Sequence, residues 1–175
     1  MNFAEVSLVI YDKILLGMIV FGIDPGYGRL GYGVLSVIRD RISIITCGCL
    51  ETSVALVPAE RLAQVRKTLE ALIEKYHPDV AGVERLFFQK NVKTALRVAE
   101  ARGVVLVTFA SAGIKIIECS PQEVKLAVTG YGNAGKQQVQ EMVRVILSLK
   151  EIPKSDDAAD ALALALATSR LVGQP

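Results

Sequence analysis

The chain has 175 residues, of which 51% are hydrophobic, and it carries a formal net charge of +2 at pH 7. This length favours a single domain with its own core, and the composition excludes an intrinsically disordered chain. Three cysteines are an odd number for a disulfide scaffold, so we expect free thiols in a reducing compartment, the cytoplasm.

Residues 1–17 differ from the rest of the chain. They are apolar, but Glu5, Asp12 and Lys13 interrupt them, and the charge-free run is too short to span a bilayer. A signal peptide would begin with a basic segment, which is absent here. We therefore interpret residues 1–17 as an upstream extension that is poorly ordered or loosely packed, and residues 18–175 as the folded domain.

Three strands open the folded domain, over residues 18–23, 30–38 and 42–50, because short apolar runs alternate there with turn residues. The connections are short, which predicts an antiparallel meander. The first strand ends on a carboxylate, Asp24, and Pro25 turns the chain at once. An aspartate at the end of a buried strand needs a positive partner, which is a metal ion, a helix N-terminus or an arginine.

Helices and two further strands make up the rest of the domain. Apolar residues at three- and four-residue spacing predict a helix that ends at His77-Pro78. Ser120, Pro121 and Glu123 form a helix-start signal, and Ser155 is placed to cap the last helix. The predicted elements are helices over residues 59–76, 91–113, 121–129, 136–149 and 156–171 and strands over residues 79–84 and 114–118. Together with the meander they predict one α/β domain, a mixed five-stranded sheet flanked by helices.

Acidic residues stand at two predicted strand ends and at the start of the last helix. Asp24 and Glu84 end strands, whereas Asp157 and Asp160 are three residues apart and share one helical face. Charge compensation at the helix N-terminus explains Asp156 and partly Asp157, but it explains the deeper Asp160 less well. Carboxylates that meet at one sheet edge repel each other unless cations lie between them. With a single histidine in the chain, oxygen ligands favour Mg²⁺ or Mn²⁺, and spacing alone leaves metal binding and charge compensation both open.

Four segments are specific enough to indicate a family. In chain order they read GIDPGYGRLGYGV, GVERLFFQKNVKTALRVAEARGV, PQEVKLAVTGYGNAGKQQVQEMV and DDAADALALALA. Together they resemble the motifs of the RuvC family of Holliday junction resolvases, and the resemblance covers about residues 18–170.

The resemblance implies an RNase H-like fold, a homodimer and an endonuclease that resolves four-way DNA junctions in recombination and repair. The implied reaction is paired, Mg²⁺-dependent phosphodiester hydrolysis. Two Mg²⁺ ions in each active site, for which Mn²⁺ would substitute, are implied to be held by Asp24, Glu84, Asp157 and Asp160. Asp156 is an additional neighbouring acid. The implied partners are the four-way junction, a second copy of the chain and the RuvA–RuvB branch-migration complex.

The resemblance also assigns DNA contacts. Lys125 and Lys136 match phosphate-contacting lysines, and Phe87 matches a loop aromatic that meets unpaired bases near the crossover. We expect Lys136 to stabilise negative charge that develops on the phosphate. The first part of the long helix, from Asn91, resembles the family's dimer interface.

Charges near Glu84 extend this expectation. Lys90 and Lys93 lie close to it in sequence and are expected to contact DNA, whereas Arg102 is expected on a solvated helix face. Residues 1–17 contribute a net charge of −1, so residues 18–175 carry +3 and, without the four candidate metal ligands, +7. Metal loading would therefore make the cleft cationic, as binding to a phosphate backbone requires.

Three other classes of protein share part of this pattern. Another RNase H-like nuclease, acting on RNA hybrids or flaps, would keep the acids without needing a junction wedge or a dimer. An actin-like ATPase or sugar kinase also has a D-x-G turn after its first strand, but it needs a second such domain, for which 175 residues leave no space. A non-catalytic junction-binding protein predicts an incomplete set of acids, whereas all four are present.

Overall fold

The computed structural model of the chain describes residues 17–85 and 92–172, without the side chains of residues 92–94. The predicted extension thus lies outside the described residues except for Gly17. Within the described part, no helix is both long and apolar enough to cross a membrane. The strands are β1 (Met18–Asp24), β2 (Arg29–Ile38), β3 (Arg41–Glu51), β4 (Val80–Glu84) and β5 (Lys115–Cys119). The helices are α2 (Pro58–Tyr76), α3 (Val92–Ser111), α4 (Pro121–Thr129), α5 (Lys136–Ile146) and α6 (Asp156–Val172).

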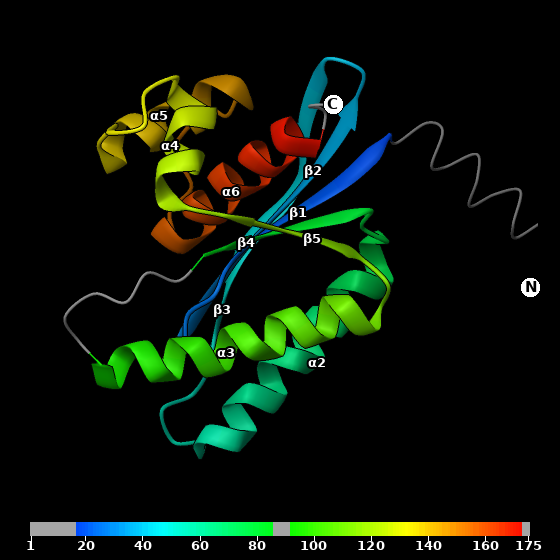
Figure 1. The fold of residues 1–175 in the computed structure, drawn as a ribbon, viewed down its shortest axis with the longest axis vertical. Coiled ribbons are helices and arrows are strands. Elements are labelled where there is room, and N and C mark those ends of the chain that lie inside the picture. Colours follow the sequence, from blue (N-terminus) through cyan, green and yellow to red (C-terminus); the bar gives the residue numbers. More distant parts are fainter. Residues whose placement is uncertain (1–16, 86–91, 173–175) are drawn as a thin grey trace, which may run out of the picture.

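The five strands form one mixed sheet in the order β3-β2-β1-β4-β5. The β1–β2 and β2–β3 pairs are antiparallel, and the β1–β4 and β4–β5 pairs are parallel. Helices α2 and α3 cover one face of the sheet, while α6, together with α4 and α5, covers the other (Figure 1). The predicted α/β fold with a mixed five-stranded sheet is confirmed.

The helix boundaries follow local signals. At the start of α4, Ser120 Oγ accepts a hydrogen bond from the Glu123 amide at 3.2 Å, and the Glu123 carboxylate accepts one from the Ser120 amide at 2.7 Å. The predicted capping box is therefore present. Helix α5 ends earlier than predicted, at Ile146, because Ser148 adopts a left-handed backbone with φ of 52°. The amide of Ala159 donates to the Ser155 carbonyl at 3.1 Å, which places Ser155 at the start of α6 as predicted.

Strand alternation decides which side chains of β1 face each helical layer. Ile19, Phe21 and Ile23 pack in the core beneath α2 and α3, whereas Val20 packs in the core beneath α5 and α6. Because successive side chains of a strand point to opposite faces, Asp24 lies on the same side as Val20. The residue that ends the strand is thereby directed toward α6.

Glycines on that same face let α6 approach the sheet closely. A Cβ at Gly22 would overlap the backbone of Ala161 and Ala165, and a Cβ at Gly82 would overlap the Thr168 side chain. Both glycines belong to the two central strands, β1 and β4. Helix α6 therefore lies directly against the strands whose last residues are acidic, which brings its own acids close to theirs.

This packing predicts the effect of adding one methyl group. In Gly22→Ala the new Cβ meets backbone atoms that cannot rotate away, so we expect a loss of about 1–3 kcal/mol in unfolding free energy, measured by urea denaturation. Gly103→Ala is the matched control, because nothing lies within 4 Å of a Cβ there. That change should be neutral or stabilise α3 by up to about 1 kcal/mol. Equal stability of the two variants would contradict the proposed contact between β1 and α6.

Candidate active site

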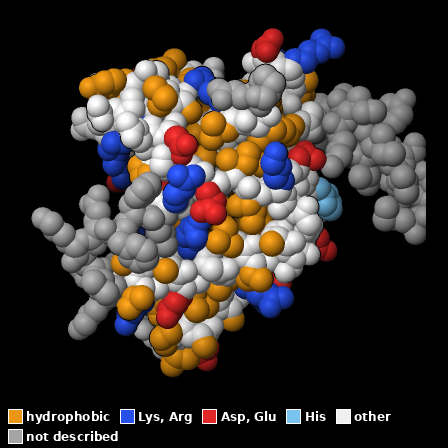
Figure 2. Space-filling view, viewed as in Figure 1, with side chains coloured by type: hydrophobic (Ala, Val, Ile, Leu, Met, Phe, Trp, Pro, Cys, Tyr) orange, Lys and Arg blue, Asp and Glu red, His pale blue; other side chains and the backbone are white. Residues whose placement is uncertain are grey.

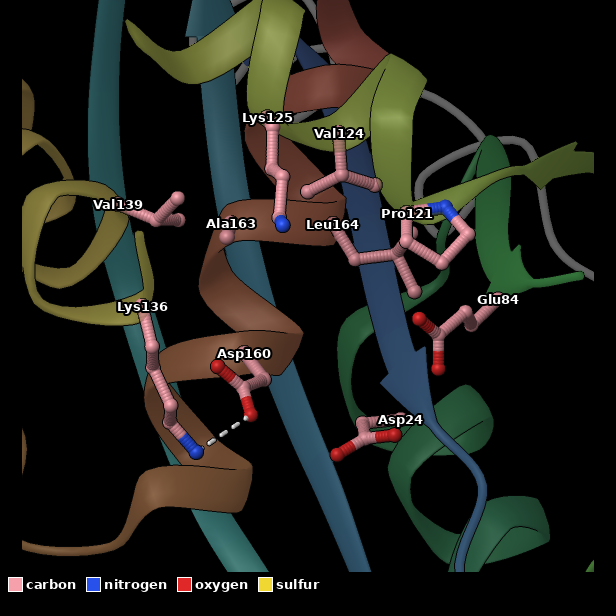
Figure 3. A pocket seen from close by; sticks show the side chains of 10 residues that line it. All are labelled: Asp24, Glu84, Pro121, Val124, Lys125, Lys136, Val139, Asp160, Ala163 and Leu164. Atoms are coloured by element: carbon pink, nitrogen blue, oxygen red, sulfur yellow. Dashed lines mark hydrogen bonds and ion pairs between the residues drawn. The ribbon is translucent and has the colours of Figure 1, made fainter. Parts of the chain in front are cut away.

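Three carboxylates from three different elements meet around one cavity of about 230 Å³. Asp24 ends β1, Glu84 ends β4, and Asp160 lies in the second turn of α6. Strands β1 and β4 are parallel neighbours, so their last residues emerge at the same edge of the sheet. Figure 3 shows all three carboxylates directed into the same space. The structure thus brings together three of the four acids predicted from the sequence.

Burial and mutual repulsion make ionisation of this cluster costly. Burial, followed by the charges of Glu84, Asp160 and Asp157, raises the pKa of Asp24 from its ordinary 3.8 to about 7. Burial, and then the charge of Asp160, also raises the pKa of Glu84. The pKa of Asp160 is raised by burial, although its hydrogen bond with Lys136 works in the opposite direction. The site accordingly favours a cation or a proton among its oxygens.

Two lysines stand on the opposite wall of the cavity from Glu84 and Asp24 (Figure 3). Lys136 is the first residue of α5, and its Nζ lies 3.2 Å from Asp160 Oδ2 and 3.2 Å from Asp156 Oδ2. Lys125 lines the cavity from α4. Asp156 itself is exposed and outside the cavity lining, and its hydrogen bond with Lys136 lowers its pKa. Both predicted lysines therefore lie at the cluster.

The fourth predicted acid, Asp157, lies beside the cavity and is not part of its lining. Its Oδ2 accepts from Arg29 Nε at 3.0 Å, and Cys49 Sγ is 3.5 Å from the same oxygen. Arg29 also contacts Glu51 at 3.4 Å. The charge of Asp157 still reaches Asp24, whose pKa it helps to raise. The sequence did not indicate Arg29, whose only signal is its position at the start of the strand that follows the Asp24 turn.

The donor set suits a hard divalent cation. Carboxylate oxygens are the ligands that Mg²⁺ and Mn²⁺ prefer, and Asp24, Glu84 and Asp160 offer only such oxygens. Among the residues that the structure describes, no three acidic, histidine or cysteine side chains lie close enough together to hold a metal ion as they stand. Of these three carboxylates, Asp160 forms an ion pair with Lys136.

Arg102 corrects one prediction. It is not on a solvated face: only 16% of its side chain is exposed, and it forms an ion pair with Glu118 of β5. Its Nε donates to the backbone carbonyl of Glu84 at 3.0 Å. Periodicity could not reveal this, because the partners lie on strands distant in sequence. Through these two contacts, Arg102 fixes the end of β4, where Glu84 enters the cavity. On the face of the molecule shown in Figure 2, basic and acidic side chains are intermixed near the middle.

Several predicted DNA contacts cannot be placed. Phe87 and Lys90 lie outside the described residues, and so does the side chain of Lys93, although its backbone lies in the first turn of α3.

The strand order and the mixed pairing place the protein in the RNase H-like class of α/β folds. The sequence model of the family described as crossover junction endodeoxyribonuclease RuvC matches residues 20–168. The chain therefore belongs to the RuvC family of crossover junction endodeoxyribonucleases, which are DNA-hydrolysing enzymes. The predicted resemblance is confirmed.

Individual relatives agree with this assignment. A crossover junction endodeoxyribonuclease RuvC from Roseiflexus sp. is 53% identical over 145 residues, covering 83% of this chain and 86% of the relative. One from Heliobacterium modesticaldum is 50% identical over 149 residues, covering 85% and 92%. The solved Thermus thermophilus RuvC in complex with a Holliday junction substrate has a TM-score of 0.84 at 35% identity, covering 89% and 94%. A yeast mitochondrial Holliday junction resolvase, with a TM-score of 0.63 at 17% identity over 93% and 84%, shares the fold.

The raised pKa of Asp24 predicts how stability varies with pH. The unfolded chain loses this proton near pH 3.8, but the folded protein keeps it until about pH 7. Stability therefore falls as pH rises through this window and stays low above it, by at most about 4 kcal/mol. Asp24→Asn removes that cost, so in metal-free buffer it should melt at a higher temperature than the parent at pH 8.

The difference in melting temperature should vanish near pH 4, where the folded parent is already protonated at Asp24. Asp40→Asn, in the exposed turn between β2 and β3, is the control and should not reproduce the gain. Parent and Asp24→Asn proteins that melt together at pH 8 would show that the cluster carries no such repulsion.

Proposed function

We propose that the protein is a structure-selective endonuclease that resolves four-way DNA junctions by paired, Mg²⁺-dependent phosphodiester hydrolysis, in recombination and repair in the cytoplasm. One observation carries the proposal: Asp24, Glu84 and Asp160 converge from three elements on one cavity that two lysines also line. The Thermus thermophilus relative, 35% identical over 89% of this chain, was solved in complex with a Holliday junction substrate, which supports the choice of DNA.

The proposed metal ligands are Asp24, Glu84 and Asp160, with Asp157 joining them if it exchanges its contact with Arg29 for the ion. When bound, Mg²⁺ would neutralise charge on the phosphate and lower the pKa of a bound water. The protein's own contribution is to hold oxygen ligands at two strand ends and on α6, around a cavity whose lining contains no cysteine or histidine. The raised pKa of Asp24 is the cost that the ion would relieve.

The two lysines have separate proposed roles. Lys136 contacts Asp160 at 3.2 Å, so it lies where negative charge would develop on a phosphate held by that acid. It also holds Asp156 away from the cavity, which leaves Asp160 as the inward-facing acid of this helical turn. Lys125, on α4, is proposed to hold the DNA backbone beside the cleaved bond.

The remaining proposals concern assembly and junction recognition. A homodimer would present two equivalent cavities to a substrate that itself has two-fold symmetry, which accounts for paired cuts. We propose that Phe87 meets unpaired bases at the crossover and that Lys90 and Lys93 contact phosphates near it. We also propose the RuvA–RuvB branch-migration complex as a partner.

A cleavage assay tests the proposal. With Mg²⁺, the protein should cut a labelled synthetic four-way junction into paired products, and cut the matching duplex and an RNA–DNA hybrid much less. Asp24→Asn should reduce junction cleavage at least about 100-fold, because it removes a metal-holding carboxylate, and should leave junction binding nearly unchanged. Asp40→Asn is the control for the same charge change at an exposed turn. Preferential cutting of the hybrid would favour the RNase H-type alternative, and full activity of Asp24→Asn would refute the metal site.

A further inference from the structure

Two arginines meet an aromatic ring in the turn that follows Asp24. This cluster consists of Tyr27 in that turn, Arg61 on α2 and Arg97 on α3. A pocket of about 680 Å³ opens beside them, lined by Tyr27, Gly28 and Arg97, among others. None of its lining residues belongs to the cavity that holds the acids. The cluster is therefore a separate feature of the same sheet edge.

Arg61 is the unusual member, because it is a cation that is almost completely buried. Only 8% of it is exposed, and its Nε donates to Thr52 Oγ1 at 2.8 Å. Its guanidinium carbon lies 4.2 Å from the centre of the Tyr27 ring. Within residues 17–85 and 92–172 no carboxylate pairs with it, and no acceptor meets its terminal nitrogens. A charge in such a buried side chain is costly without an anionic partner, so an anion at its terminal nitrogens would stabilise it.

Arg97 adds a second guanidinium to the same ring. Its carbon lies 5.1 Å from the Tyr27 centre, and its side chain is exposed at the pocket. Among the described residues it too has no carboxylate partner; Glu100 lines the same pocket but pairs with neither arginine. Two like charges on one aromatic ring repel each other, and an anion between or beside them would relieve that repulsion.

The turn itself is held in place by Thr52, the residue to which Arg61 donates. Thr52 Oγ1 donates to the Tyr27 carbonyl at 3.1 Å, while its amide donates to the Gly28 carbonyl at 2.9 Å. Gly28 has no side chain to cover the guanidinium: a Cβ there would lie 3.3 Å from an Arg61 terminal nitrogen. Access to Arg61 from the Gly28 side thus depends on the absence of a side chain.

We propose that Tyr27, Arg61 and Arg97 bind a backbone phosphodiester of the DNA strand next to the cleavage site. This inference rests on the proposed function. Tyr27 is three residues from Asp24, a span of at most about 10 Å. DNA rises about 3.4 Å per nucleotide along each strand, so, with the reach of the side chains added, the phosphate lies a few nucleotides from the cut. Guanidinium groups match phosphate oxygens in charge and in planar donor geometry.

A second copy of the chain is the competing occupant of the pocket, since the first half of α3 was predicted at a dimer interface. DNA is favoured because the charge left without a partner is positive on both arginines. A two-fold contact centred on this patch would bring the same arginines together and add repulsion.

The test is the salt dependence of junction binding by Arg97→Gln. Fluorescence anisotropy with a labelled four-way junction, in Ca²⁺ without Mg²⁺ to prevent cutting, gives Kd at several NaCl concentrations. We expect Kd to rise at least about threefold, and the slope of log Kd against log salt to fall by about 1 for each contact removed. Arg66→Gln is the matched control, because Arg66 is exposed on α2 and paired with Glu70 at 2.7 Å. It should leave both quantities unchanged.

Two further measurements distinguish failure of the phosphate site from failure of the proposed function on which it rests. Single-turnover cleavage with Mg²⁺ by the parent protein and by Arg66→Gln tests the proposed function separately, and the two should cleave at the same rate because Arg66 lies outside both sites. If the parent neither binds nor cuts the junction, the proposed function fails. If the parent cuts the junction but Arg97→Gln keeps the parental salt slope, the phosphate site alone is refuted. Sedimentation velocity must show the parental oligomeric state in the variant; a shift to a smaller species with an unaltered slope would assign the pocket to a second copy.

Discussion

Electrostatic repulsion at one edge of the sheet is the constraint on which the rest of the structure depends. Asp24 and Glu84 end adjacent parallel strands, and Asp160 is held against them by α6. The strands and the helix that carry these three residues fix their backbone positions. The outcome is visible in the pKa of Asp24, which burial and neighbouring charges raise to about 7. A site with this property is stable when a cation neutralises it and strained when it is empty and ionised.

The close approach of α6 is what creates this arrangement. Gly22 leaves room for its backbone and Gly82 for its Thr168 side chain, so the helix lies nearer to the central strands than any larger residue would permit. The helix is buried almost all round, from Ala161 to Ser169, between the sheet and the smaller helices α4 and α5. Those helices in turn supply Lys125 and Lys136. The contacts that pack α6 in the core therefore also position the acidic and basic side chains of the candidate active site.

The elements and three of the acids could be predicted from the sequence, because periodicity and strand ends are local signals. Arg102, Arg29 and Arg61 could not. Each uses a long side chain to reach a partner on another element: Arg102 reaches the Glu84 carbonyl, Arg29 reaches Asp157, and Arg61 reaches Thr52 and the Tyr27 ring. Helical spacing correctly placed Asp157 near Asp160. It could not show that the Asp157 carboxylate pairs with Arg29 and lies outside the cavity lining.

The most direct test of this account is metal binding itself. Isothermal titration calorimetry of the full chain with Mn²⁺ at pH 8 should show saturable binding to the parent protein, because the ion relieves the repulsion among Asp24, Glu84 and Asp160. In Asp24→Asn the affinity should fall at least about 10-fold, whereas Asp40→Asn should bind as the parent does. Parental affinity in the Asp24→Asn protein, or the absence of binding to the parent, would contradict the central claim.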